Sequence, residues 1–106
     1  MIQIEIVPRK GSNAYTLLRS RVHRANTWKW GNRAKTRLRH VQSKGWLDVK
    51  RSGAVATAHV VPKDPRDIFY LTEKLTGRLV AWFGDELESV TVRFGVKKKA
   101  GRAKKR

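Results

Sequence analysis

Hydrophobic and polar residues alternate along four stretches of the chain, which is the pattern expected of strands with one buried face. These stretches cover residues 2–7, 46–51, 54–61 and 87–96. In the first, Ile2, Ile4 and Ile6 are predicted to point into the core. In the last, Val90 and Val92 are predicted to share one face. The sequence therefore predicts a sheet of four strands.

The two middle stretches are predicted to form a hairpin around Ser52-Gly53, a two-residue turn that suits tightly connected strands. With that turn, Leu47 points into the core. The opposite face carries Trp46 and His59, which are predicted to lie directly across from each other.

Apolar residues recur at helical spacing in three further stretches. The first predicted helix begins near Asn13, after a cap at Ser12. The second covers residues 33–43, with Ala34, Leu38 and Val41 expected to face inward. Gly45 follows it at the position of a left-handed C-terminal cap.

The third helix has the clearest boundaries. Asp64 is predicted to cap its N-terminus, and Pro65 occupies its first helical position. Asp67 complements the positive end of the helix dipole. Gly84 is predicted to end it.

This order of elements predicts one α+β domain over residues 1–96. We expect a four-stranded antiparallel sheet with helices on one face. That is the split βαβ, ferredoxin-like arrangement, with a broken first crossover helix. Residues 97–106 hold seven charges and no large apolar side chain, so they are expected to form a disordered basic tail.

An alternative fold is suggested by residues 33–61, RAKTRLRHVQSKGWLDVKRSGAVATAHVV. This stretch resembles the recognition helix and wing of winged-helix DNA-binding domains. The resemblance implies a helix that enters the DNA major groove. The upstream segment departs from the pattern, because only one helix and an irregular Trp segment precede it.

Charge is segregated along the chain. Residues 1–46 hold 11 basic residues and one acid, residues 47–94 hold seven of each sign, and residues 95–106 hold seven basic residues and no acid. The net charge of +17 thus comes from two cationic blocks around a neutral segment. A polyanion is the partner that best offsets such self-repulsion, and nucleic acid is the commonest polyanion.

One set of cations is regularly spaced. Arg33, Arg37, His40 and Lys44 recur at i, i+4, i+7 and i+11, which on the predicted helix forms a single stripe. Like charges at this spacing repel by a few tenths of a kcal/mol, and no acid relieves them here. We therefore interpret the stripe as a phosphate-binding face rather than as an ordinary solvated one.

Aromatic residues lie among these cations. Trp28 and Trp30 flank Lys29, and a base stacked on an indole is worth about 1–3 kcal/mol. Each indole has two interpretations, as a base-stacking surface or as part of the core. We expect one of each, with Trp30 facing the ligand. Trp46 poses the same question on the outer face of the sheet.

The predicted nucleic-acid-binding residues are Arg21, Arg24, Lys29, Trp30, Arg33, Lys35, Arg37, Arg39, His40, Lys44, Lys97, Lys98, Lys99, Arg102, Lys104, Lys105 and Arg106, and the stacking candidates are Trp28 and Trp46.

The sequence gives no support to an enzyme. It has no cysteine, which excludes disulfides and thiol catalysis, and it contains none of the common phosphate-loop, dinucleotide or metalloprotease motifs. The histidines at 23, 40 and 59 are too far apart for a local metal pair. We predict no catalytic residue, no metal and no cofactor. The N-terminus lacks a signal-peptide pattern, and no apolar run approaches the length of a bilayer span, so we expect a cytoplasmic protein with no membrane partner.

These observations predict an RNA-binding protein that contacts mainly phosphate, as a component of the ribosome or of another ribonucleoprotein. Two alternatives remain open at this point. One is a winged-helix-like DNA-binding or chromatin protein. The other is a non-enzymatic interaction module whose partner is an acidic protein.

Overall fold

The structure is a computed structural model that describes residues 2–95. In chain order its elements are β1 (Gln3–Pro8), α1 (Ala14–His23), β2 (Trp28–Trp30), β3 (Arg37–His40), β4 (Trp46–Ser52), β5 (Val55–Val61), α2 (Pro65–Phe83) and β6 (Leu87–Arg93). The predicted tail, residues 97–106, lies outside the described residues.

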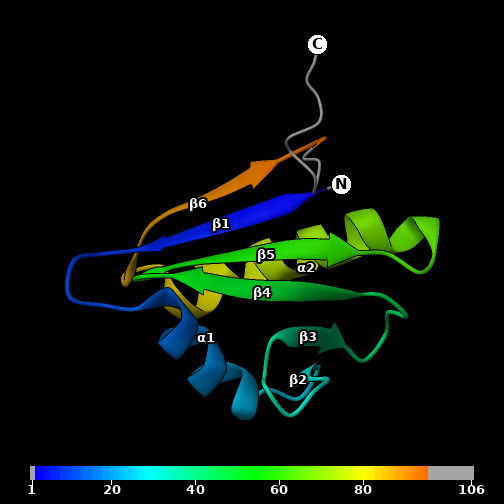
Figure 1. Ribbon diagram of the computed structural model, residues 1–106, viewed down its shortest axis with the longest axis horizontal. Helices are drawn as coiled ribbons and strands as arrows, with labels where there is room; N and C mark the ends of the chain where they lie inside the picture. Colours follow the sequence, from blue (N-terminus) through cyan, green and yellow to red (C-terminus); the bar gives the residue numbers. More distant parts are fainter. Residues whose placement is uncertain (1, 96–106) are drawn as a thin grey trace.

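The strands form one antiparallel sheet in the order β2-β3-β4-β5-β1-β6. The helices pack on one face of this sheet, and α2 lies behind β4 and β5 in the view of Figure 1. Within residues 2–95 no helix covers the other face, which we call the open face of the sheet. The two edges are β2, the short strand WKW, and β6.

The core lies between the sheet and the two helices. Leu18 and Val22 from α1 meet Leu71, Leu75 and Leu79 from α2 in one buried cluster. The inward residues of the strands complete this cluster, as the alternating pattern predicts. Burying side chains of this size contributes about 1.5–3 kcal/mol each, so this cluster is the main source of stability.

The predicted limits of α2 are confirmed. The side chain of Asp64 accepts a hydrogen bond from the backbone nitrogen of Arg66, and Pro65 occupies the first turn. Gly84 follows the last helical residue. The cap of α1 is Asn13 rather than Ser12, because the Asn13 side chain accepts from the backbone nitrogen of Thr16 at 3.1 Å.

The four-stranded, ferredoxin-like prediction is wrong, because residues 2–95 already form a sheet of six strands. All four predicted strands are present, as β1, β4, β5 and β6. The additional two, β2 and β3, extend the sheet beyond β4. The α+β class itself is confirmed.

The source of the error is the segment 33–43, which is not a helix. Asn32 and Arg33 lie in a loop, and Arg37 begins β3. Leu38 pairs with Leu47 of β4 and is fully buried, as an inward strand residue should be. The winged-helix alternative fails for the same reason, because its recognition helix would occupy this segment.

The β4–β5 hairpin has the predicted faces but a shifted register. Ser52 pairs with Val55, so the turn consists of Gly53 and Ala54. Gly53 has a φ of +62°, which explains the glycine at that position. Moving a turn by one residue shifts the register by two and leaves each side chain on its face. Trp46 therefore pairs with Val61 rather than with His59.

Gly45 is likewise not a helix cap, since it is not among the positive-φ glycines. It is buried in the loop between β3 and β4, where its backbone lies against β5 and Asp67. Asp67 accepts hydrogen bonds from the Ser43 hydroxyl at 2.8 Å and from the backbone nitrogen of Lys63 at 2.8 Å. This carboxylate joins the β3–β4 loop to the start of α2.

A candidate nucleic-acid interface on the open sheet face

Three cations surround one indole on the open face of the sheet. Trp46 begins β4, and the Cζ atom of Arg37 lies 4.3 Å from the centroid of its ring. The Cζ of Arg39 lies 5.9 Å and the Nζ of Lys63 lies 4.9 Å from the same ring. We call these four residues the Trp46 cluster. The attraction of each cation to the ring face is worth about 0.5–1 kcal/mol at an exposed site.

Strand pairing brings these residues together. Arg39 stands directly opposite Trp46, and Arg37 stands opposite Asp48. Side chains two residues apart on a strand share a face, so both arginines of β3 lie on the open side. Lys63 comes from the loop after β5, whose Val61 pairs with Trp46.

One acid, Asp48, accompanies the cluster. Its Oδ1 accepts a hydrogen bond from the Trp46 Nε1 at 3.1 Å, which fixes the orientation of the indole. Among residues 2–95 the ion pairs are Arg9–Glu88 and Arg93–Glu5, so none includes Arg37, Arg39 or Lys63.

Arg37 has an unsatisfied donor. Its Nε is buried and has no hydrogen-bond partner within the described part of the chain. Buried donors in proteins are usually satisfied, and an exception is a feature that needs an explanation. A planar guanidinium held against an indole presents its N–H groups in a fixed orientation, which suits a phosphate.

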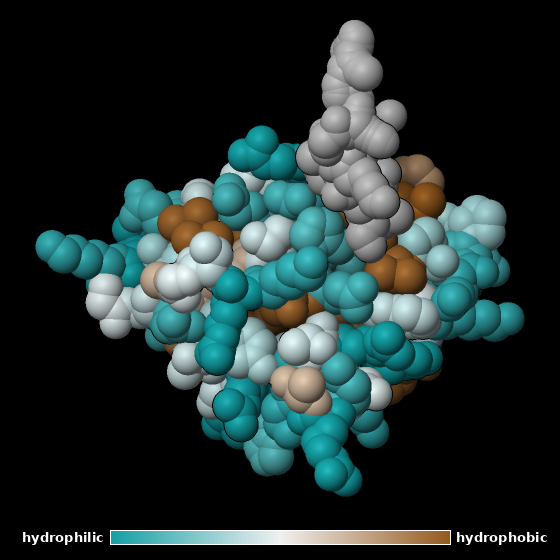
Figure 2. Space-filling view, viewed as in Figure 1, coloured by the Kyte–Doolittle hydropathy of each residue, from teal (hydrophilic) through white to brown (hydrophobic). Residues whose placement is uncertain are grey.

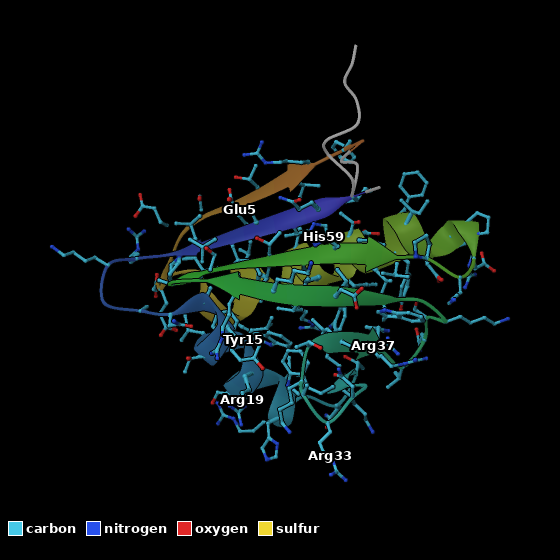
Figure 3. The ribbon with its side chains drawn as sticks, viewed as in Figure 1. Glu5, Tyr15, Arg19, Arg33, Arg37 and His59 are labelled. Atoms are coloured by element: carbon cyan, nitrogen blue, oxygen red, sulfur yellow. The ribbon has the colours of Figure 1, made fainter. Side chains whose placement is uncertain are left out.

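The loop between β2 and β3 carries two more cations. Asn32 organises it, since its Oδ1 accepts from the backbone nitrogens of Thr36 and Arg37. The Tyr15 hydroxyl of α1 also donates to the Lys35 carbonyl at 2.8 Å. Lys35 has a φ of 57°, which is a strained conformation for a non-glycine residue. Arg33 is exposed and points away from the sheet (Figure 3).

The rest of the open face is polar and nearly balanced in charge. Glu5 and His59 lie in front of β1 and β5 (Figure 3), and His59 contacts Gln3 through its Nε2 at 3.0 Å. Figure 2 shows this face as largely hydrophilic, with small separate hydrophobic areas. The excess of positive charge is therefore concentrated on the β2–β3–β4 side.

The structure divides the predicted binding residues among several places. On the open face of β2, β3 and β4 lie Lys29, Arg37, Arg39 and Trp46, whereas Arg33 and Lys35 lie in the β2–β3 loop and Lys44 lies in the β3–β4 loop. Arg21 and Arg24 lie at the end of α1, in the helical layer. The residues Lys97, Lys98, Lys99, Arg102, Lys104, Lys105 and Arg106 lie outside the described residues. The predicted helical stripe does not exist, because its members fall in a loop, on both faces of β3 and in a second loop.

His40 is not on the open face of the sheet. It points into the molecule, where its ring packs edge-on against the rings of Trp28 and Tyr70. Burial lowers the pKa of His40, and the positive charges of Lys74 and Arg78 lower it further. The backbone N–H of Gln42 donates to its Nδ1 at 3.1 Å, which requires a neutral ring.

The two tryptophans of β2 also face inward. Trp28 is fully buried, which leaves no ring face for a base, so it is a core residue and not a stacking surface. Trp30 is half-buried against the core and contacts the ring of Tyr15. The exposed residue of β2 is Lys29, which pairs with Arg39.

The sequence pattern did not indicate Lys63, nor Lys74 and Arg78 beside His40. They belong to the segment whose net charge is zero, and Lys63 and Lys74 each stand next to an acid in the sequence. Only the pairing of β4 with β5 and the packing of α2 bring them near the other cations. No local pattern marks them.

Comparisons of the chain with protein-family models, with curated proteins and with solved structures gave no match.

Residues 2–95 contain no group of three or more side chains that could together hold a metal ion. No helix within the same range is both long and apolar enough to span a membrane.

Proposed function

We propose that the protein binds nucleic acid, with RNA favoured, through the Trp46 cluster and the β2–β3 loop. The observation that carries the proposal is the Trp46 cluster itself. It gathers three cations around one indole on an open sheet face, and none of them is paired with an acid within the described residues.

The cluster suits phosphate better than base. Arg37 already occupies the ring of Trp46 at 4.3 Å, so the indole acts as a support that orients the guanidinium. Arginine N–H groups bind phosphate oxygens in pairs. Contacts of this kind position a strand without selecting its sequence. The same proposal includes the predicted role of the protein as a cytoplasmic component of a ribonucleoprotein. Such a role agrees with a weak preference for RNA sequence.

The test is a binding titration with a labelled RNA hairpin. The double variant Arg37→Gln/Arg39→Gln should weaken binding at least tenfold, because hydrogen bonds to charged groups contribute about 1.5–3 kcal/mol each. A plot of the logarithm of the binding constant against the logarithm of the salt concentration should also become less steep. Its slope should fall by about 0.7–0.9 for each phosphate group that the variant no longer binds.

The matched control is Arg19→Gln/Arg66→Gln, which removes the same charge and the same residue type from exposed positions on the two helices, away from the open face. Equal weakening in both variants would mean that binding depends on total charge alone, and would contradict the proposed site. Competition with duplex DNA and with single strands measures the preference for RNA. The interaction-module alternative would be favoured if the chain recovered an acidic protein from nuclease-treated lysate and itself showed no affinity for RNA.

A further inference from the structure

A second cationic surface lies in the helical layer. A hollow of about 250 Å³ separates the end of α1 from the second half of α2. A neighbouring hollow of about 190 Å³ lies between α2 and β2–β3. Thr27 and Arg78 line both hollows, so the two meet there. We call them together the helix-side groove.

Among the residues that the structure describes, the groove is lined by four cations and no acid. Arg21, Arg24 and Arg78 line the first hollow, and Lys74 and Arg78 line the second. None of the ion pairs found within residues 2–95 includes any of these four side chains. Arg21 is held in place by Trp82, since its Cζ lies 5.5 Å from the centroid of that ring.

Two aromatic residues of the core, Trp28 and His40, form part of the wall of the second hollow. Trp28 lines it, is fully buried, and has an indole N–H that lacks an acceptor in the described chain. His40 lines it as a neutral ring, and the positive charges of Lys74 and Arg78 help to lower the pKa of His40. A negatively charged ligand in this hollow would offset the positive charges of Lys74 and Arg78 around His40.

We propose that the helix-side groove binds consecutive phosphate groups of a nucleic-acid strand. A strand suits it better than a single phosphate does, because the cations are spread over two adjoining hollows with Arg78 between them. The identity of the ligand rests on the proposed function, whereas the site does not, since it shares no residue with the Trp46 cluster. The protein would then contact nucleic acid on two faces at once.

The test uses the indole N–H signals in NMR spectra, because the tryptophans report on separate places. Trp82 and Trp28 line the helix-side groove, and Trp46 reports on the open face. The full chain is titrated with a ten-nucleotide oligouridylate, with uridine monophosphate and with inorganic phosphate. We expect the signals of Trp82 and Trp28 to shift with the oligonucleotide at a concentration at least tenfold below that needed for either small ligand.

The double variant Arg24→Gln/Arg78→Gln should weaken the response of Trp82 and Trp28 at least tenfold and leave that of Trp46 in place. Its matched control, Arg19→Gln/Arg66→Gln, removes one exposed cation from each helix outside the groove. This control should respond as the original chain does. If the double variant melts early, Arg24→Gln alone carries the same test, because Arg24 is an exposed cap residue.

Unchanged Trp82 and Trp28 signals, or equal responses in both double variants, would overturn the groove as a site. Equal affinity for oligonucleotide and for free phosphate would overturn the strand as its ligand. A response of Trp82 without any response of Trp46 would support the groove while contradicting the proposed open-face site, so the two failures are distinguishable.

Discussion

At the scale of single residues, basic side chains take different roles on the two faces of β3. Arg37 and Arg39 project to the open face, whereas His40 projects into the core. A strand alternates its faces at every residue, so a basic run such as RLRH cannot form one basic surface. Two positively charged arginines therefore stand on the open face, while the inward histidine is kept neutral.

His40 provides a residue-scale prediction. Burial lowers the pKa of this ring in the folded state, and Lys74 and Arg78 of α2 add to the effect. Trp28, Gln42 and the Tyr70 ring are its other neighbours. Because the unfolded chain binds a proton more readily than the folded one, the free energy of unfolding should fall as pH falls below about 6.5. Above that pH, the titration of His40 should have no effect on stability.

The measurement is an NMR titration of the His40 ring, paired with urea unfolding between pH 5 and 8. Lys74→Gln should raise the pKa of His40, because it removes one of the repelling charges. Arg66→Gln removes an exposed charge from the first turn of the same helix and serves as the control. A His40 pKa that is insensitive to Lys74→Gln would contradict this electrostatic account.

At the scale of elements, local signals predicted α1, α2 and the four alternating strands, and tertiary contacts decided the segment that forms β2 and β3. α2 has its cap, its proline and its terminal glycine within its own sequence. Residues 33–43 have no proline at the first helical position, and the helix was predicted there from Gly45 and from the helical spacing of Leu38 and Val41. Val41 is in fact exposed at 54%. The sequence did contain a sign of the β2–β3 hairpin. Apolar and polar residues alternate in 28–30 and again in 37–40, and the turn-forming pair Gly31-Asn32 lies between these two stretches.

The candidate site was predicted only in part for the same physical reason. Its arginines were identified from charge, but their arrangement depends on which strand pairs with β3. Lys63 reaches Trp46 only because β5 lies beside β4. Contacts between residues far apart in sequence leave no periodic pattern, so composition can indicate a ligand class without locating its site.

The β3–β4 loop provides an element-scale prediction. A Cβ atom at Gly45 would lie 2.5 Å from the Val61 carbonyl oxygen and 2.8 Å from the Asp67 Oδ2. Gly45→Ala must therefore displace backbone or the Asp67 carboxylate, and should lower the free energy of unfolding by about 1–3 kcal/mol.

Gly77→Ala is the control for this substitution. Gly77 lies within α2, and apart from its chain neighbours and the helix backbone around it, no atom of the described residues lies within 4 Å of the added Cβ position. It should stabilise the protein by about 0.5–1 kcal/mol, since alanine is the better helix former. Equal stability of the two variants, measured by urea unfolding, would show that the loop yields and that Gly45 is not a required close contact.

At the scale of the whole molecule, positive charge lies on two surfaces, one on each side of the hydrophobic core. The Trp46 cluster lies on the open face of the sheet, and the helix-side groove lies in the helical layer. The two surfaces draw on cations from both the basic N-terminal block and the neutral segment. Folding therefore brings cations from separate parts of the sequence onto the same surface.

The last prediction separates this folded charge from the C-terminal basic block. Ending the chain after Gly95 removes seven basic residues and no acid, so the net charge falls from +17 to +10. Each phosphate contact that the block makes with RNA contributes about 0.7–0.9 to the salt slope. The truncated chain should therefore bind an RNA hairpin more weakly and with a smaller salt slope, while Arg37→Gln/Arg39→Gln in the truncated chain should reduce both further. If truncation alone abolished all salt dependence, the terminal block would be the whole binding site, and the surfaces of the folded domain would have no part in it.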